Sequence, residues 1–361
     1  MKSLLKRTFI TLCVVALALV GWWLLTSPTA VSNQSTNYVD MHVHAAGIGA
    51  GGSGAFINEA MADSYKFDIY LWAMGVSEAE LQDQGDGVLL RKLSKRISES
   101  TRVSDAVILA MDGVIDGDGT LDRARTQLYV PNDYLMQELH KYPNLHFGAS
   151  INPYRPDAIE RLQAAKSGGA VLLKWIPNIM HIDPADPSLE PFYRKLAELD
   201  LPLLCHTGQE RSFADADDRY GDPLRLELPL SLGVKVIAAH IATTGDNEGQ
   251  RNFDRILPLF RKYPNLYTDI SSLTQANKLN YLAEALQHVD LHERMIYGSD
   301  WPLQFIPLVS ALYHLNHISL ADAKAAMGFS NQWDRDVVLK EQLGVPEAVF
   351  ARTRSLLNLP R

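Results

Sequence analysis

The 361-residue sequence has few cysteines and no concentrated charge. Its two cysteines, Cys13 in a long apolar run and Cys205 in a strand-like run, are expected in separate compartments, which excludes a disulfide framework. No block of five or six like charges occurs, and the formal net charge is −8. A polyanion-binding surface is therefore not expected, and neither is a nucleic-acid partner. With 47% hydrophobic residues, the chain can instead bury a large core.

The N-terminal segment differs from the rest of the chain. A few basic residues precede an uncharged run over residues 8–25 that ends in two tryptophans and two leucines. Eighteen helical residues span about 27 Å, enough to cross the hydrocarbon core of a membrane. We therefore expect residues 1–25 to be a membrane anchor, with the remainder exported, to the periplasm in a Gram-negative cell. A cleaved signal peptide is the alternative, although Pro28 does not suit a cleavage site before Val31.

The remaining sequence predicts a barrel. After a polar linker over residues 26–37, short apolar runs alternate with longer amphipathic stretches, the pattern of βα units around a parallel sheet. Eight strand-like runs occur, the number that a closed barrel requires. They are 38–42, 106–111, 145–149, 170–174, 201–206, 234–240, 266–269 and 294–297. The predicted fold is α/β, a (β/α)8 TIM barrel over residues 38–361 preceded by a single N-terminal membrane-spanning or signal helix, with C-terminal helices packed outside or below it.

Helix-like segments separate the runs, several of them beginning beside a capping residue. They are 132–141, 157–165, 189–199, 251–262 and 280–287. Residues 45–54 are too rich in glycine for a regular element, and we expect a mobile loop after the first strand. The loop has a glycine spacing like that of dinucleotide-binding motifs, but such a site needs a helix opening there and an acidic residue downstream. We do not favour that interpretation.

Ionisable residues follow several predicted strands at their C-terminal ends, where such barrels have their catalytic mouth. A lone histidine at a strand end is more often structural than a ligand. Here six ionisable residues recur at equivalent places, which favours a functional site. They are His42, His44, Lys174, His206, His240 and Asp300.

The alternation of a strand explains the first pair. Side chains two residues apart on a strand point the same way, so His42 and His44 can reach one ion. A zinc-like metal binds imidazole nitrogen and leaves a position open for water in a catalytic site. His206 and Asp300 would complete the ligand set. Asp40 shares the strand face of the pair and is expected either to orient a ligand or to cap the strand.

The ordered series DMHVH, LLKWIPN, LLCHTG, VIAAHIA and YGSDWP resembles the amidohydrolase superfamily, specifically its amidohydrolase-related branch. The resemblance runs from residue 38 to residue 302 and covers all eight predicted strands. It implies that His42, His44, His206 and Asp300 bind metal. It also implies that His240 lies near the reacting water and substrate in a one-metal site, or binds a second metal.

Lys174 leaves the number of metals open. In two-metal relatives, a lysine at the end of strand four is carboxylated and bridges both ions. The apolar flanks of Lys174 would depress the pKa of an unpaired lysine, which carboxylation requires. The alternatives are an ammonium that binds a substrate carboxylate and a structural cation paired with Asp300 or Glu210. We expect one or two divalent ions, with zinc favoured, although manganese, iron and cobalt also suit histidine and carboxylate ligands.

Three charged residues on loops after strands three and five are candidates for substrate binding, because such loops build substrate pockets in barrels. They are Arg155, Glu210 and Arg211. An arginine suits a carboxylate best, through its planar fork of donors. A solvated loop charge is the alternative for each.

The pattern predicts a metal-dependent hydrolase that uses a metal-activated water on a small-molecule amide, ester or lactone. Asp300 is expected to shuttle the proton, and His240 or the metal to stabilise the oxyanion. The first alternative is a metal-dependent lyase, a decarboxylase or hydratase, which Arg155 or Arg211 in the pocket would favour. The second is a non-catalytic membrane-tethered binding protein, which the complete ligand set disfavours. The substrate and the oligomeric state stay open.

Overall fold

The computed structural model describes residues 8, 16, 20–32, 34–304 and 307–360. Its centre is a parallel eight-stranded sheet whose strands lie side by side in their order along the chain. They are β1 (Tyr38–His44), β3 (Val103–Leu109), β5 (Leu145–Ala149), β6 (Leu172–Trp175), β7 (Leu203–His206), β8 (Val236–Ala239), β11 (Leu266–Asp269) and β12 (Met295–Ile296). Each strand overlaps one of the eight predicted runs, so the strand prediction is confirmed.

Backbone contacts join the two edges of this sheet. Val43 forms a parallel bridge with Trp301, and the amide of His44 donates to the Trp301 carbonyl at 3.0 Å. The amide of Asp300 donates to the carbonyl of His42 at 2.9 Å. The chain after β12 therefore pairs with β1, and the sheet curls into a TIM-barrel-like arrangement that fits the predicted (β/α)8 fold.

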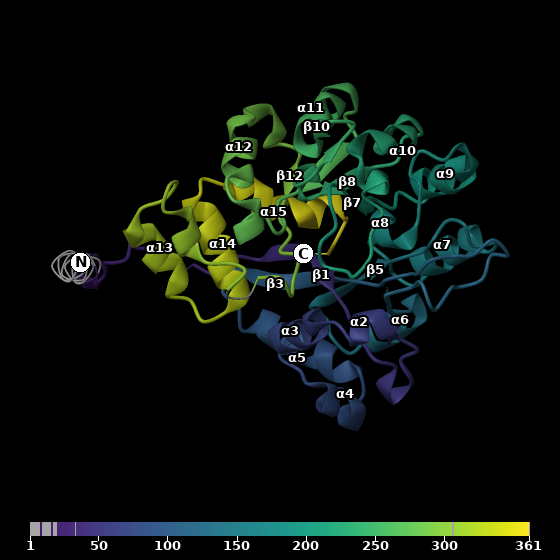
Figure 1. Ribbon diagram of the computed structural model, residues 1–361, viewed down its shortest axis with the longest axis horizontal. Coiled ribbons are helices and arrows are strands. Elements are labelled where there is room, and N and C mark those ends of the chain that lie inside the picture. Colours follow the sequence, from purple (N-terminus) through teal and green to yellow (C-terminus); the bar gives the residue numbers. More distant parts are fainter. Residues whose placement is uncertain (1–7, 9–15, 17–19, 33, 305–306, 361) are drawn as a thin grey trace.

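Helices surround the sheet (Figure 1). They are α2 (Glu59–Ala62), α3 (Tyr65–Met74), α4 (Glu78–Gln84), α5 (Gly87–Ser98), α6 (Asn132–Leu139), α7 (Ala158–Ser167), α8 (Pro177–Met180), α9 (Glu190–Glu198), α10 (Glu227–Ser231), α11 (Asn252–Lys262), α12 (Tyr281–Gln287), α13 (Leu320–Met327), α14 (Gln332–Gln342) and α15 (Glu347–Leu356). The five predicted helices correspond to α6, α7, α9, α11 and α12, with ends shifted by no more than two residues. Two small antiparallel pairs, β2 (Phe56–Ile57) with β4 (Leu128–Tyr129) and β9 (Asp246–Asn247) with β10 (Gln250–Arg251), lie outside the barrel sheet.

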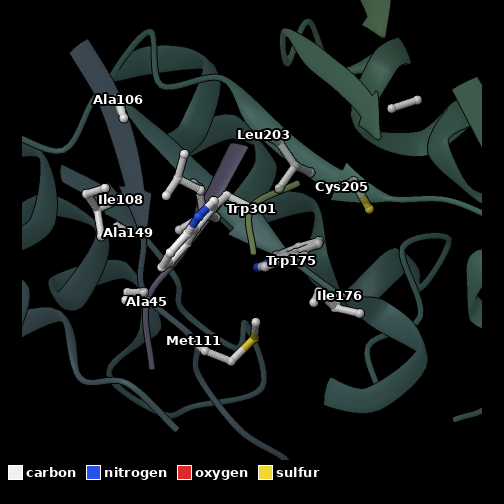
Figure 2. Close-up of a cluster of buried hydrophobic side chains, with 14 of the residues drawn as sticks. Ala45, Ala106, Ile108, Met111, Ala149, Trp175, Ile176, Leu203, Cys205 and Trp301 are labelled. Atoms are coloured by element: carbon white, nitrogen blue, oxygen red, sulfur yellow. The ribbon is translucent and has the colours of Figure 1, made fainter. Parts of the chain in front are cut away.

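Large apolar side chains pack between the strands and the helices. Trp175 and Trp301 are fully buried, and Figure 2 shows both within the same cluster as Leu203. The indole nitrogen of Trp175 donates to the Ile151 carbonyl at 2.7 Å, so its burial leaves no donor unsatisfied. Cys205 belongs to this cluster, and burial raises the pKa of its thiol to about 12, which leaves it unreactive.

The glycine-rich loop after β1 is irregular, as predicted, but a buried carboxylate holds it in place. Asp86 accepts hydrogen bonds from the amides of Ile48 at 3.1 Å and Gly49 at 3.0 Å, and from the Ser53 hydroxyl. Gly49 has a φ of 90°, which favours glycine, and a Cβ at Gly47 would collide with the Asp86 carboxylate. The loop therefore has a defined path beside the barrel mouth.

The N-terminal part of the described chain contacts α13. Residues 20–25 are helical, and the Lys324 ammonium donates to the carbonyls of Trp23 at 2.9 Å and Thr26 at 2.6 Å. Within the described residues, no helix combines the length and the apolar character needed to cross a membrane. Most of the segment predicted as an anchor, residues 1–25, and Cys13 with it, lies outside the described residues.

Candidate metal centre

His42, on β1, is held by a carboxylate from β11, two strands away around the closed sheet. Its Nδ1 lies 2.7 Å from Asp269 Oδ2, at the end of β11. Because the carboxylate can only accept, Nδ1 carries the proton and Nε2 presents a lone pair. Burial lowers the pKa of His42 to about 4, the Lys174 charge adds to this effect, and Asp269 opposes it. The ring is therefore neutral and oriented as a metal ligand.

Three potential ligand atoms converge at the C-terminal end of β1. His42 Nε2 lies 3.2 Å from His44 Nε2 and 3.4 Å from Asp300 Oδ1, and His44 Nε2 lies 3.2 Å from the same oxygen. Ligands at about 2.1 Å from a tetrahedral ion lie about 3.4 Å from one another. The spacing and the donor types therefore fit a divalent metal of the zinc class.

Asp300 is ionised in this setting. Burial favours its neutral form, but electrostatic interaction with the His42 and His240 rings and the hydrogen bond with His44 outweigh burial and hold its pKa well below the ordinary range. Its backbone has a φ of 66°, a conformation that non-glycine residues rarely adopt. Such strain is kept where the surrounding structure fixes a side chain, as the pairing of Asp300 with β1 does here.

His206, at the end of β7, lines the same cavity as His42, His44 and Asp300. Its ring centroid is 5.2 Å from that of His240, and its Nδ1 is 3.6 Å from Glu210 Oε2. Its Nε2 is buried and has no hydrogen-bond partner among the described residues. An unpartnered buried nitrogen fits a metal ligand. Two groups among the described residues have ligand atoms within 4.8 Å of one another, namely His42 with His44 and Asp300, and His42 with His240 and Asp269, and His206 belongs to neither.

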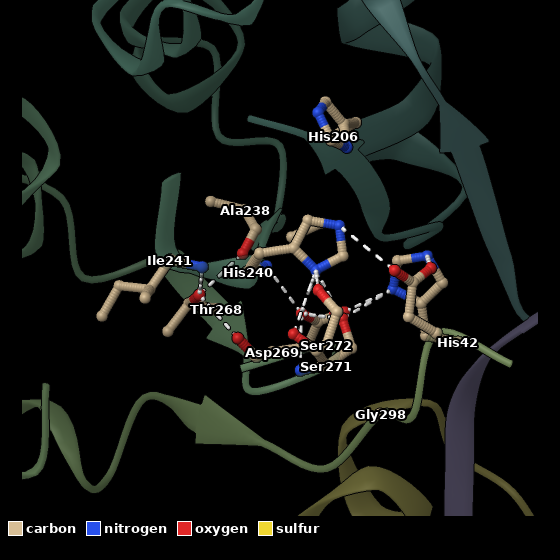
Figure 3. A network of polar contacts seen from close by, with 12 residues as sticks. His42, His206, Ala238, His240, Ile241, Thr268, Asp269, Ser271, Ser272 and Gly298 are labelled. Atoms are coloured by element: carbon tan, nitrogen blue, oxygen red, sulfur yellow. Dashed lines mark hydrogen bonds and ion pairs between the residues drawn. The ribbon is translucent and has the colours of Figure 1, made fainter. Parts of the chain in front are cut away.

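His240, after β8, belongs to a polar network centred on Asp269 (Figure 3). Its Nδ1 lies 3.1 Å from the Ser271 carbonyl and 2.8 Å from the Ser271 hydroxyl, while that hydroxyl donates to Asp269 at 2.6 Å. Nδ1 must therefore donate to Ser271, and Nε2 presents a lone pair 4.0 Å from Asp300 Oδ2. Burial holds the pKa of His240 well below its usual value, and the Lys278 charge adds to the shift.

Lys174 is fully buried at the end of β6. Its ammonium lies 2.9 Å from His42 Nε2, and no carboxylate forms an ion pair with it in the described part of the chain. Burial lowers its pKa, and the charges of Asp300 and Asp269 oppose the shift. The structural-cation alternative, with an ion pair to Asp300 or Glu210, is therefore not supported, whereas the carboxylated and the substrate-binding alternatives remain.

A largely apolar cavity of about 120 Å³ opens above these groups. Its base holds the histidines, Lys174 and Asp300, and α3 contributes Phe67 and Tyr70 to its wall. The Tyr70 hydroxyl donates to the Ser212 carbonyl at 2.9 Å, which ties α3 to the loop after β7. The segment between β1 and β3 therefore shapes the space in which a substrate would lie.

A family model described as amidohydrolase matches residues 39–304. The chain belongs to the amidohydrolase family. This confirms the resemblance to the amidohydrolase-related branch that the strand-end motifs indicate.

Solved structures resemble this amidohydrolase at low sequence identity. A TIM-barrel protein from Bordetella bronchiseptica has 14% identity and a TM-score of 0.55, over 89% of this chain and 99% of its own. A 5-carboxyvanillate decarboxylase from Novosphingobium aromaticivorans, with bound manganese, has 15% identity and a TM-score of 0.46, over 92% of this chain and 100% of its own. An amidohydrolase from Bifidobacterium longum subsp. infantis has 13% identity and a TM-score of 0.46, over 90% and 100%. No curated protein sequence matches the chain.

The three predicted substrate-binding residues of this amidohydrolase fall in different places. Glu210 and Arg211 line the cavity. Arg155 is not among the described residues that line it, because its guanidinium forms a bidentate pair with Asp112 at 2.6 and 2.7 Å. That pair fixes the loop after β5, and we drop Arg155 as a substrate ligand.

Two features of the site are not predicted from the sequence. Ser271 and Ser272 orient His240, and Lys278 places a buried ammonium on the cavity wall. The run Ser271-Ser272 directly after a predicted strand is a signal that could have pointed to the serines. Lys278 follows the end of β11 by nine residues, in a segment without periodicity, and carries no comparable signal.

Proposed function

We propose that this amidohydrolase is a metal-dependent hydrolase that cleaves an amide, ester or lactone bond in a small molecule. One observation carries the proposal. The Asp300 carboxylate lies between the predicted ligands and His240, with Oδ1 3.2 Å from His44 Nε2 and Oδ2 4.0 Å from His240 Nε2. An ionised carboxylate in that position is suited to accept a proton from water.

A divalent ion held by His42, His44, His206 and Asp300 would acidify a water molecule and polarise the acyl group of a substrate. Imidazole nitrogen favours zinc, and the mixed histidine and carboxylate set also admits manganese. Manganese is the metal in the decarboxylase from Novosphingobium aromaticivorans.

Protein groups would handle the protons. Asp300 accepts a proton from the attacking water and delivers it to the leaving group. The hydrogen bonds at Nδ1 make His240 Nε2 an acceptor, so we assign it to orienting the water. This replaces the sequence-based expectation that His240 stabilises the oxyanion, which a nitrogen without a proton cannot do.

Asp300→Ala is expected to abolish turnover, because it removes the proton acceptor. The assay follows incorporation of oxygen from labelled water into products of a panel of amides, esters and lactones, with the metal content of each sample measured in parallel. Asp116→Ala, in an exposed loop, is the matched control and should keep the wild-type rate. An Asp300→Ala variant with a near wild-type rate would falsify the assignment.

A lyase of the same family is the second candidate, because Arg211 lines the cavity and can hold a carboxylate. Release of carbon dioxide without incorporation of labelled oxygen would favour it. The metal stoichiometry per chain, together with the intact mass, tests for a carboxylated Lys174. One metal per chain and no carboxylate adduct on Lys174 would favour the lyase. A purified protein without metal would favour the non-catalytic binding protein.

A further inference from the structure

Lys278 is buried, although it belongs to a short surface turn whose other residues are exposed to water. It ends the 3-10 turn η6 (Ala276–Lys278), and the residues next to it, Asn277 and Leu279, are exposed. Lys278 itself is only 8% exposed. Lysine side chains on such turns normally extend their ammonium into solvent. Here the turn directs the side chain inward, to the wall of the active-site cavity.

Burial of the Lys278 side chain lowers its pKa, and the charges of Asp300, Glu210 and Asp269 oppose the shift. The ammonium donates to the Ser272 hydroxyl, and within the described residues no carboxylate forms an ion pair with it. An ammonium has three donors, so two are left for another partner. Burying a charge without a counter-ion destabilises a fold. Such a lysine is expected where a ligand supplies the missing charge.

The field of this ammonium reaches the metal centre. The Lys278 charge contributes to lowering the pKa values of both His206 and His240. The same cavity holds the carboxylates of Asp300 and Glu210, which would repel a ligand with several negative charges. Lys174 and Arg211 also line this cavity, but the Lys174 ammonium contacts His42 Nε2 at 2.9 Å and Arg211 is exposed. Among the described residues of the cavity, Lys278 is therefore the buried unpaired ammonium that contacts no predicted metal ligand, and it suits a ligand with a single negative charge.

The size and polarity of the cavity limit the rest of the ligand. Its volume of about 120 Å³ is close to the ~150 Å³ of a cavity that accommodates benzene. Its walls are mainly apolar and include the side chains of Phe67, Ile176 and Leu303. A compact body the size of one ring fits this space.

We propose that Lys278 is the anion-binding residue of this cavity, and that the substrate is a ring-sized monocarboxylate whose carboxylate binds the Lys278 ammonium while its reacting group lies at His42, His44 and Asp300. The proposal rests on the proposed function only in assigning this cavity to the substrate. It names a substrate class for the hydrolase, and the same contact would serve the lyase.

Binding of benzoate and of its neutral analogue benzamide tests the proposal without turnover. Titration calorimetry of the full chain is carried out with metal bound and after chelation. In both states the wild type should prefer benzoate. In the chelated protein Lys278→Met should weaken benzoate binding about tenfold or more, and leave benzamide binding nearly unchanged. Lys262→Met, which removes an exposed lysine paired with Glu227, is the matched control and should behave as the wild type.

Thermal unfolding accompanies the titration, because Lys278→Met must be shown to be folded. Loss of an unpaired buried charge should leave the melting temperature unchanged or raise it. Equal affinities for benzoate and benzamide in the chelated wild type would overturn the proposal. An equal loss of affinity for benzoate and for benzamide in Lys278→Met would also overturn it, since this would mean that the lysine only shapes the cavity. Absence of hydrolysis with the benzoate preference intact would contradict the proposed function and leave this inference standing.

Discussion

Asp269 acts on the metal centre through other residues. Its Oδ2 accepts the proton of His42 Nδ1, and its Oδ1 accepts the His240 amide at 2.8 Å and the Ser271 hydroxyl at 2.6 Å. Burial would raise the pKa of Asp269, but the electrostatic interaction and hydrogen bond with the His42 ring outweigh burial and lower it strongly. One fully buried carboxylate thus sets the tautomer of His42 and positions His240.

Asp269→Asn should lower metal affinity about 10- to 100-fold, because an amide has only one acceptor oxygen for these three donors. Competition against a chromogenic chelator measures the affinity. Asp290→Asn, on the exposed turn after α12, is the matched control and should keep wild-type affinity. Unchanged affinity in Asp269→Asn would show that His42 needs no carboxylate partner.

At the residue scale, the alternation of strands explains what the sequence could predict. His42 and His44 follow from two-residue spacing on one strand, and Lys174, His206 and Asp300 follow from their positions at strand ends. Lys278 could not be predicted in this way, because the direction of a side chain on an irregular turn depends on what packs against the turn. The pairing of Arg155 with Asp112 likewise depends on the approach of two loops.

At the scale of elements, α14 lies beyond the matched residues 39–304 and yet holds the segment that carries Asp300. The Lys340 ammonium donates to the Gly298 carbonyl at 3.1 Å and to Asp336 at 2.7 Å, and it is fully buried. Tyr297 also donates to Asp336, at 2.9 Å. Helix α14 therefore stabilises the backbone that enters the site.

Lys340→Met should destabilise the fold by about 3–5 kcal/mol, because it leaves the buried carboxylate of Asp336 without its counter-ion. Urea denaturation measures the free energy of unfolding. Lys235→Met, which removes a surface ion pair with Asp200, should cost about 1 kcal/mol or less. If both variants lost the same small amount, the buried pair would not hold α14 in place.

The segment between β1 and β3 shows where sequence patterns fail for an element. Helix α3 places Phe67 and Tyr70 on the cavity wall, but its outer face exposes Tyr65 and Ile69. A helix that is apolar on both faces lacks the amphipathic period that predicts helices. For this reason the sequence pattern predicts the helices between the later barrel strands but does not predict α3.

At the scale of the whole molecule, the fold follows from eight apolar runs separated by amphipathic stretches, and tertiary contacts then close the sheet through Val43 and Trp301. The N-terminal segment precedes all eight strands, and most residues of its charged start and apolar run lie outside the described residues. We propose that this segment anchors an exported barrel to a membrane. Its described end contacts the outer helix α13.

Deletion of residues 1–30 should move the protein from the membrane fraction to the soluble fraction and preserve metal binding, because the strands and predicted ligands all follow residue 37. Fractionation of cells that express each form, with immunodetection, measures the distribution. A full-length product found in the soluble fraction, with a mature N-terminus near Val31, would instead establish a cleaved signal peptide.

The backbone pairing of Asp300 with His42 also bears on when the protein acquires its metal. His44 and Asp300 are 256 residues apart in sequence. A ribosome that adds about 5–20 residues per second needs on the order of ten to fifty seconds to pass from one to the other. During that time the first two histidines have left the ribosome without their carboxylate partner. The predicted ligand set is therefore complete only after the last strand of the barrel has been made, because the segment that follows that strand carries Asp300.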